Sequence, residues 1–405
     1  MKLAALLAKA FAASVLSLLF VVFVTGQNDR AKDDLKRSFI NSDLVRVDSA
    51  KTGDKELKLS FQADGRHFEL ILEPNDIRST RYIAEDTRLM GMFPMEQTGV
   101  TTYKGKIAGE QVSEVRLSII DGSVKGFFGT GTVRYFIESA VKYSNLAAVD
   151  ESVVYREEDS LNQEPFFCDA DIPGQIEYGK GIAAGASETG SVSMVRFLEL
   201  ATDADLEFVT TLGGAVQANN EILGILNMVE GTYSSELNLT ISVVYQHTWT
   251  AADPFAGAGS SAVLANFKNH WNANFPVSAI PRDAAHLFTA KPNVLSQGIA
   301  YVSVICNAPQ SSYGVNGYIN WAPAKYMIPA HELGHNLGAN HVEAAQSCGN
   351  TLMNAQLSGS TAMTFCTLSR SQIGTHVANN SSCLSESPPP PPTPTPTPTP
   401  TPSPT

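Results

Sequence analysis

The stretch from His331 to His341 constrains this chain more than any other part of its sequence, and it reads His-Glu-Leu-Gly-His-Asn-Leu-Gly-Ala-Asn-His. Residues four apart share one face of a helix, so His331 and His335 can both bind one metal ion. Glu332 would then face the coordination position that the histidines leave open. Gly338 can adopt the positive φ that ends a helix in a sharp turn, and His341 would return as a third ligand. Three histidines and a water are the ligands of a catalytic zinc, whereas a structural zinc has four protein ligands.

The predicted zinc site indicates a hydrolytic reaction. Zinc lowers the pKa of a bound water to about 7 and polarises a carbonyl oxygen. Glu332 is placed to take the proton of that water as general base and to pass it later to the leaving amine. We therefore expect hydrolysis of peptide bonds by direct attack of a zinc-bound water, without an acyl-enzyme intermediate.

The zinc motif and its surroundings resemble the metzincin metallopeptidases, and within them the reprolysin (adamalysin-like) family. In these enzymes a Met-turn places a methionine beneath the metal, and Met353 follows His341 at a suitable distance. Reprolysins usually have aspartate directly after the third histidine, where this chain has Val342, but that residue is not a ligand. The resemblance covers roughly residues 192 to 384 and includes three further stretches: Arg282–Thr289, Gly298–Cys306 and Phe365–Ile373.

The resemblance implies an α/β (α+β) fold. A metzincin-type zincin catalytic domain would combine a twisted mixed sheet with a zinc-binding helix and follow a β-rich propeptide. Alternating apolar residues on both sides of Asp64-Gly65 and of Asp121-Gly122 independently predict two hairpins in the N-terminal region.

Local patterns predict further elements in the C-terminal region. Apolar residues at helical spacing over residues 204–230 indicate a helix, and the β-branched residues of Val302–Ile305 indicate a strand just before the zinc motif. Pro329 must lie in the first turn of the zinc helix, where its missing N–H costs nothing, or else kink that helix. Ser369 and Gln372 have the spacing of a capping box for the last helix.

We expect the chain to consist of four segments. Residues 1–26 have two lysines before an apolar run, which is typical of a signal peptide; an uncleaved N-terminal anchor is the alternative. Residues 27–191 form a β-rich propeptide and junction, for which an independent β-rich domain of unknown role is the alternative. Residues 192–387 form the reprolysin-like catalytic domain. Residues 388–405 are rich in proline and threonine and form a disordered tail or linker.

Charge and hydropathy restrict the partners. The formal net charge of -12 argues against a nucleic-acid partner. The apolar run near the N-terminus is shorter than the roughly 20 residues that a spanning helix needs, and no second run is long enough. We therefore expect a secreted, extracellular monomer that acts on protein or peptide substrates and has no stable membrane span.

The five cysteines predict two disulfides and one further thiol. Four lie in the C-terminal region, where an exported protein would pair them in one of three connectivities. The reprolysin resemblance implies the pairs Cys306 with Cys383 and Cys348 with Cys366. Cys168 remains, just ahead of the catalytic domain, and as a thiolate it could bind the zinc and keep the enzyme latent, as a cysteine switch does. An incidental or intermolecularly paired thiol is the alternative.

These patterns together predict a secreted zinc metalloendopeptidase made as a zymogen. The alternative is a catalytically silent protein that retains the zinc and binds peptides or mediates adhesion; the intact Glu332 counts against it. The reprolysin resemblance also allows a structural calcium site at Glu199 and Asp283. The remaining histidines of this region have no ligand spacing to one another and are expected to be surface or core polar groups: His247, His270, His286 and His376.

Overall fold

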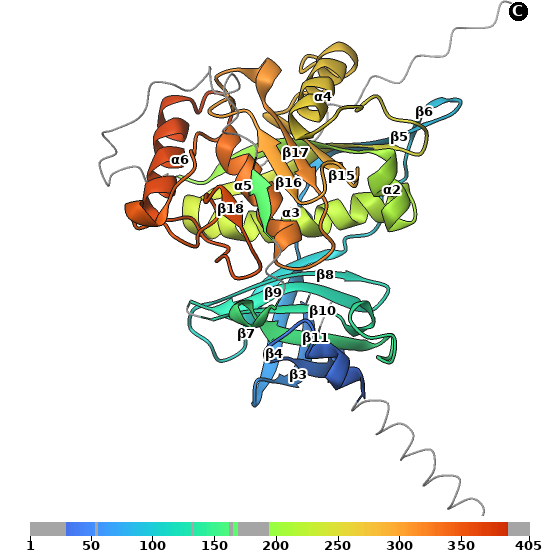
Figure 1. Cartoon of the computed structure of the whole chain (residues 1–405), viewed down its shortest axis with the longest axis vertical. Coiled ribbons are helices and arrows are strands. Elements are labelled where there is room, and N and C mark those ends of the chain that lie inside the picture. Colours follow the sequence, from blue (N-terminus) through green and yellow to red (C-terminus); the bar gives the residue numbers. More distant parts are fainter. Residues whose placement is uncertain (1–29, 53–55, 132, 162–164, 169–193, 388–405) are drawn as a thin grey trace, which may run out of the picture.

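The computed structural model describes residues 30–52, 56–131, 133–161, 165–168 and 194–387 (Figure 1). The predicted signal peptide, most of the predicted junction and the tail from residue 388 lie outside the described residues, so those predictions stay untested. We call residues 30–168 the N-terminal part and residues 194–387 the C-terminal part.

The N-terminal part is built on an antiparallel sheet that has nine strands among the described residues, in the order β1-β11-β10-β9-β8-β7-β4-β3-β2. Both predicted hairpins are confirmed, because Asp64-Gly65 and Asp121-Gly122 have the positive φ values of tight two-residue turns. The strands are β1 Asp43–Arg46, β2 Asp48–Thr52, β3 Glu56–Ala63, β4 Arg66–Pro74, β7 Thr102–Ile107, β8 Ser113–Ile120, β9 Ser123–Thr130, β10 Arg134–Ser139 and β11 Glu151–Arg156; short 3-10 helices η1 and η2 span Ala140–Lys142 and Glu157–Asp159.

A second sheet forms the centre of the C-terminal part, with the order β18-β12-β16-β17-β15-β13-β14-β5-β6 among the described residues. Its strands pair both parallel and antiparallel, so the predicted mixed sheet is confirmed. The strands are β5 Arg78–Arg88, β6 Gly91–Pro94, β12 Phe166–Cys168, β13 Arg196–Ala204, β14 Leu239–Trp249, β15 Ala284–Thr289, β16 Gln297–Ala300, β17 Tyr313–Gly317 and β18 Gln356–Leu357.

The helices cover both faces of this second sheet. Helix α4 packs on one face, against β16 and β17, while α3 and α5 pack together on the other. Figure 1 shows α3 running between the two sheets, and it contacts β14 on one side and β7, β8 and β9 on the other. The helices are α2 Leu206–Leu212, α3 Ala215–Leu237, α4 Ser260–Asn274, α5 Ala324–Asn336 and α6 Thr367–Asn379, with 3-10 helices η3 Pro309–Ser311 and η4 Ala344–Gln346.

The structure corrects the predicted helix over residues 204–230. Residue Ala204 still belongs to strand β13, and the helical pattern is divided into α2 and α3. Gly213 and Gly214 lie between these helices with φ values of 86° and 143°. Such values are open to glycine but costly for other residues, so the pair ends one helix and starts the next.

The predicted strand at Val302–Ile305 is wrong. These residues form turns, and Ser303 and Cys306 have positive φ. Their N–H groups donate to the end of α5 instead of to a sheet: Ser303 N–H to His335 O (2.9 Å) and Val304 N–H to Asn336 O (3.0 Å). The last carbonyls of a helix need partners, and this loop supplies them.

The predicted capping box at Ser369 and Gln372 is wrong. Helix α6 begins at Thr367 with Cys366 as N-cap, so Ser369 is buried inside the helix and Gln372 accepts a hydrogen bond from the N–H of Asn340 (3.1 Å). Pro329 lies inside α5 rather than in its first turn, which leaves the stated alternative of a kink at this residue.

The N-terminal part supplies strands to both ends of the second sheet, which no sequence pattern indicated. Strand β5 pairs in parallel with β14, and β6 pairs with β5 beyond it. At the other end β12 lies between β16 and β18. The two parts are therefore joined by strand pairing within the second sheet as well as by the packing of α3 against the N-terminal sheet.

Buried charges of both parts meet beside α5. Lys325 lies 3.1 Å from Glu221 on α3 and 3.9 Å from Glu138 on β10. Lys142 lies 2.6 Å from Glu138, and Lys125 lies 3.5 Å from Glu221. Burial acts to raise the pKa of Glu138, but Lys142 and Lys325 outweigh it and the pKa lies at about 2. In the same way Lys325 and Lys125 outweigh the burial of Glu221, whose pKa is also about 2.

We expect this cluster to make stability depend on pH. Because the pKa of Glu138 is below its ordinary value of 4.5, the carboxylate stabilises the folded chain fully above pH 4.5, and this contribution is lost as the pH falls toward 2. Glu138→Gln should therefore lower the free energy of unfolding by about 3 kcal/mol at pH 6 and by much less near pH 3. Denaturant unfolding at both pH values measures this difference.

Glu69→Gln is the matched control, because Glu69 pairs with Lys58 on the half-exposed surface of the N-terminal sheet. It should change the unfolding free energy by less than about 1 kcal/mol at either pH. An equal loss for Glu138→Gln at pH 6 and near pH 3 would contradict the assignment of the pH dependence to this carboxylate.

Candidate metal centre

Helix α5 and the turn after it bring the predicted histidines together. His331 and His335 lie one turn apart on α5 and are almost fully buried. Gly338 has a φ of 94°, as predicted, and the chain turns back so that His341 approaches both. The Nε2 atoms of His331 and His335 are 2.9 Å apart, and each is 3.2 Å from Nε2 of His341.

The other ring nitrogen of each helical histidine is held by a main-chain carbonyl. Nδ1 of His331 bonds to Leu352 O, and Nδ1 of His335 bonds to Ala339 O at 2.8 Å. A carbonyl oxygen can only accept, so Nδ1 carries the proton in each ring and Nε2 presents its lone pair to the cluster. Burial, and then His341, lower the pKa of His331 to about 3, although the Leu352 carbonyl opposes this, so the ring is neutral.

This donor set fits a zinc ion. Nitrogen ligands about 2.05 Å from a tetrahedral zinc lie about 3.3 Å from one another, close to the separations found here. Lone pairs that converge in a buried site repel one another unless a cation lies between them. The three histidines are therefore arranged as metal ligands rather than as partners of one another.

Cys168 lies at the open side of the three histidines. Its Sγ is 3.4 Å from Nε2 of His335 and 3.5 Å from Oε2 of Glu332. The Sγ atom and the three Nε2 atoms all lie within 4.8 Å of one another. A thiolate and an imidazole on one tetrahedral zinc would be about 3.6 Å apart, which is close to the distance from Cys168 Sγ to Nε2 of His335.

Glu332 lies beside the cluster and against strand β16. The exposed fraction of Glu332 is 1%, and a Cβ atom added to Gly298 would lie only 2.1 Å from its Oε1. Only glycine therefore leaves room for the carboxylate at its present position. Sequence reasoning placed Gly298 in a strand but did not find this contact, since the two residues are distant in the chain.

Met353 lies against α5 at Gly334, between the two helical histidines. It is fully buried, and a Cβ atom on Gly334 would lie 2.8 Å from its Sδ. The turn is held from both sides, because Met353 O accepts from Val342 N–H (3.0 Å) and the preceding carbonyl of Leu352 accepts from His331. The glycine between the helical histidines thus admits the methionine.

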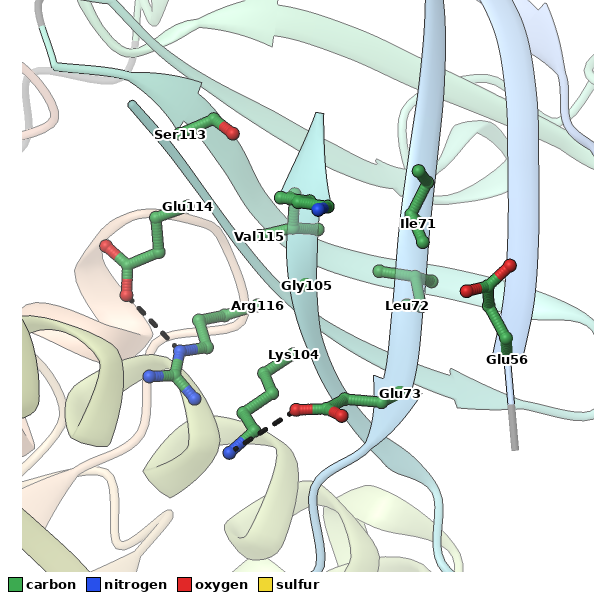
Figure 2. A pocket seen from close by; sticks show the side chains of 11 residues that line it. Glu56, Ile71, Leu72, Glu73, Lys104, Gly105, Ser113, Glu114, Val115 and Arg116 are labelled. Carbon is green, nitrogen blue, oxygen red and sulfur yellow. Dashed lines mark hydrogen bonds and ion pairs between the residues drawn. The ribbon is translucent and has the colours of Figure 1, made fainter. Parts of the chain in front are cut away.

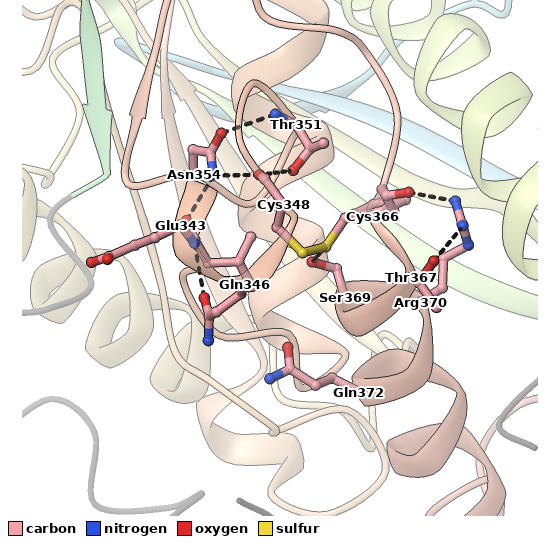
Figure 3. The surroundings of a disulfide bond; sticks show 12 residues. Glu343, Gln346, Cys348, Thr351, Asn354, Cys366, Thr367, Ser369, Arg370 and Gln372 are labelled. Atoms are coloured by element: carbon pink, nitrogen blue, oxygen red, sulfur yellow. Dashed lines mark hydrogen bonds between the residues drawn. A yellow bond between two sulfur atoms is a disulfide. The ribbon is translucent and has the colours of Figure 1, made fainter. Parts of the chain in front are cut away.

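Both implied disulfides are confirmed: Cys306 with Cys383 and Cys348 with Cys366. Figure 3 shows the second one next to Asn354, whose side-chain amide donates to the carbonyls of Val342 (2.6 Å) and Cys348 (2.9 Å). The disulfide and this amide fix the loop that carries His341 to the Met-turn.

The structure has a capping box elsewhere, in this loop at η4. The Glu343 side chain accepts from the N–H of Gln346, and the Gln346 side chain accepts from the N–H of Glu343 at 2.8 Å (Figure 3). The pattern predicted at Ser369 and Gln372 has the same spacing, so spacing alone did not distinguish the two sites.

Sequence reasoning also missed the part played by Asn336, which follows the second histidine. Its side chain donates to Tyr301 O (2.8 Å) and accepts from Nε2 of His286 (2.9 Å), whose Nδ1 accepts from Asn316 (3.2 Å). Burial lowers the pKa of His286 to about 4, so this ring is neutral. Asn336 thus ties the end of α5 to β15 and to the loop after β16. The signal available in the sequence was the position of Asn336 within the metal-binding motif.

Three further histidines of the C-terminal part take no part in the metal cluster of the described residues. His247 is buried and bonds to Asp203 (3.0 Å), while His376 donates to Ile305 O (3.0 Å). His270 is partly buried among aromatic rings of the α4 region. All three are polar groups of the fold.

The predicted calcium ligands already have partners in this chain. Arg81 of β5 binds the carboxylate of Glu199, and Asp283 accepts a hydrogen bond from the Glu199 N–H at 2.7 Å. Burial raises the pKa of Asp283 to about 7, and the hydrogen bond opposes this only in part. The Arg81 guanidinium therefore lies where calcium was predicted, and the calcium site stays a prediction.

The buried histidine cluster on a helix, the turn at Gly338 and the methionine beneath are the features of a metzincin site. Residues 196–388 match the model of the Reprolysin (M12B) family zinc metalloprotease. Disintegrin and metalloproteinase domain-containing protein 9 of Homo sapiens is 25% identical over 342 residues, which cover 79% of this chain and 40% of that protein. Zinc metalloproteinase-disintegrin-like brevilysin H2a of Gloydius brevicauda is 35% identical over 168 residues, 39% of this chain and 38% of that protein.

Residues 196–388 are therefore similar to the reprolysin family of zinc metalloproteases. We call these residues the metzincin domain. The chain spans less than half the length of these curated relatives. Among solved structures, metalloproteinase-II from Bacteroides fragilis is 12% identical with a TM-score of 0.46, over 84% of this chain and 93% of that one, which is too distant to transfer any property.

Proposed function

We propose that this protein is a secreted zinc endopeptidase made as a zymogen, in which Cys168 closes the metal centre. The observation that carries the proposal is the position of its Sγ, 3.4 Å from Nε2 of His335 and beside Glu332. A thiolate at that position occupies the place of the water that hydrolysis requires.

Each residue of the centre has a role in this proposal. His331, His335 and His341 hold the zinc, and the Nδ1 bonds of the first two fix their ring orientation. A bound zinc lowers the pKa of water and polarises the substrate carbonyl. Glu332 takes the proton of the attacking water and delivers it to the leaving amine. Met353 packs beneath the histidines and supports their positions.

Strand β12 covers the edge of β16 as well as the metal centre. Phe167 and Cys168 pair in parallel with Gln297 and Gly298 of β16, and Phe166 pairs with Leu357 of β18. A substrate peptide that adds to an exposed strand would need the same edge of β16. Removal of β12 therefore frees the metal and the peptide-binding edge together.

The relationship to longer relatives supports the zymogen proposal. The match to the human protein covers 79% of this chain, more than residues 196–405 can supply, so it includes much of the N-terminal part. We propose this part as the propeptide, with the cut between residues 169 and 193. Secretion fits the predicted signal peptide and both disulfides. No helix among the described residues has the length and apolarity to cross a membrane.

Removal of the metal tests the enzymatic proposal. The metzincin domain freed of its N-terminal part should hydrolyse a denatured protein such as casein, lose this activity on dialysis against a zinc chelator, and regain it with about one equivalent of zinc per chain. Product peptides and zinc content are measured on the same samples. If the reconstituted chain binds zinc but hydrolyses nothing in a broad peptide library, the silent peptide-binding protein becomes the better interpretation.

A calcium site would need Arg81 to withdraw from Glu199. We therefore propose calcium at Glu199 and Asp283 only for the metzincin domain after the N-terminal part has left.

A further inference from the structure

The edge of β14 carries a docking site for the N-terminal part. Main-chain bonds run from Val243 N–H to Ile77 O (2.8 Å) and from Thr250 N–H to Thr87 O (3.1 Å), at the two ends of the pairing with β5. Strand addition of this kind supplies affinity through main-chain hydrogen bonds and specificity through side chains.

Side chains extend this contact into the interior. Asp86 of β5 is 1% exposed, and it accepts from the hydroxyls of Thr248 (3.0 Å) and Thr250 (2.9 Å). Tyr82 donates from its hydroxyl to the side-chain carbonyl of Gln246 at 2.7 Å. Gln246 and Thr248 of β14 are polar and fully buried, so loss of β5 would leave them to find other partners.

A face of α3 provides a second docking site. Gly224, Asn227 and Gly231 recur three and four residues apart and therefore share one side of the helix. A Cβ atom on Gly224 would lie 3.2 Å from the Ser118 side chain, and one on Gly231 would lie 2.8 Å from Cγ of Arg116. The absent side chains admit strand β8 of the N-terminal sheet to the helix.

Polar groups lock this face in register. The Asn227 amide donates to Leu117 O at 3.1 Å, while Arg116 lies 2.8 Å from the Glu230 carboxylate and donates to the Ser234 hydroxyl at 3.1 Å. Arg116 and Glu230 are 8% and 5% exposed, so the pair is buried by the docking itself. A buried charge pair of this kind is costly to break, since one partner is left uncompensated.

A pocket of about 580 Å³ lies over β3, β4, β7 and β8 of the N-terminal sheet and includes Arg116 in its lining (Figure 2). Two ion pairs lie among its lining residues, Arg116 with Glu114 at 3.2 Å and Lys104 with Glu73 at 3.6 Å. The residues of this region therefore serve the contact between the two parts, and we assign no ligand to the pocket.

Helix α3 depends on the N-terminal sheet for its complete burial. Every residue from Ala218 to Tyr233 is buried, so no side of the helix over that stretch faces solvent. A helix buried all round belongs to a core. Loss of the N-terminal sheet would expose one side of it, together with Glu230.

We propose that cutting the chain between its two parts does not separate them: residues 30–161 stay bound to the metzincin domain through the β14 edge and the Gly224–Asn227–Gly231 face of α3. The inference rests on the proposed function in one respect, that the chain is cut between residues 169 and 193. Cys168 then remains attached to a bound propeptide, which keeps it near the zinc at high effective concentration. Activation requires release of the propeptide or a second cut next to β12.

The test uses the full chain with a recognition sequence for a site-specific protease inserted in residues 179–187. Glu332→Ala is present throughout, so that the readout does not depend on peptidase activity. After the cut, gel filtration at about 1 µM should show both fragments in one peak, since they separate only if the Kd is weaker than that concentration. Arg116→Ala, and separately Gly231→Leu, should weaken the complex by at least about 100-fold.

Arg66→Ala is the matched control, because Arg66 pairs with Glu110 at 2.6 Å within the N-terminal sheet and does not reach the metzincin domain. Its fragments should elute together. Separate peaks for the parent fragments would overturn the proposal, as would Arg116→Ala and Gly231→Leu complexes as tight as the control. If one of the two docking variants fails to fold, the other variant, whose substitution lies in the other part of the chain, still tests the proposal. If the fragments separate, the peptidase proposal still stands. If the parent has no peptidase activity, the gel-filtration result still tests the docking.

Discussion

Glu332→Gln is expected to lower kcat/KM for peptide hydrolysis by the metzincin domain freed of its N-terminal part by about 10³-fold, the range of a lost general base, while the zinc content stays unchanged. The loss corresponds to about 4 kcal/mol in the activation free energy. Glutamine has nearly the same shape as glutamate and fits beside Gly298, so the histidines should keep their positions. Initial rates on a quenched peptide and metal analysis of the same sample measure both quantities.

Glu207→Gln is the matched control, since Glu207 lies on α2 and pairs with Lys291 on the surface of the domain. It should keep the activity of the parent. A Glu332→Gln enzyme within about tenfold of the parent would remove this residue from the role of base. Loss of zinc from that variant would instead make Glu332 part of the metal site.

Cys168→Ala is expected to raise the peptidase activity of the uncut chain at least about tenfold. The thiol is removed from the metal, but β12 still pairs with β16 and β18, so activity should stay below that of the metzincin domain freed of its N-terminal part. Activity is followed on small peptides while gels show that the chain remains uncut. Replacement of zinc by cobalt gives an independent readout, because a thiolate on cobalt produces a strong near-ultraviolet absorption band that the variant should lack.

Phe167→Ala serves as the control, because Phe167 precedes the cysteine in the same strand and is 45% exposed. It should keep the absorption band and the latency. The cysteine switch is wrong if uncut Cys168→Ala remains as inactive as the parent and its cobalt spectrum equals that of the parent.

The parts of the site predicted correctly from the sequence depend on residues close together in the chain. The spacing of His331 and His335 is a property of one helix, and the positive φ of Gly338 is a property of one residue. The Asp-Gly hairpins are equally local. The disulfide pairs came from the resemblance to a family, since four cysteines alone allow three connectivities.

The parts that could not be predicted depend on which distant segments meet. Strand β5 is rich in polar residues, and nothing in it indicates that it pairs with β14 instead of the N-terminal sheet. The close contact of Gly298 with Glu332 depends on the packing of β16 against α5. Val302–Ile305 has the composition of a strand, but its N–H groups are taken by the end of α5. In each case tertiary contacts override the local preference.

The β5–β6 hairpin also changes the outer boundary of the second sheet. Without it the sheet would end at β14, a strand of eleven residues; with it the sheet ends at β6, a strand of four. A long open edge presents unpaired N–H and C=O groups that can pair with the same edge of another molecule. The β5–β6 hairpin therefore covers an edge along which two molecules of this chain could otherwise pair sheet to sheet.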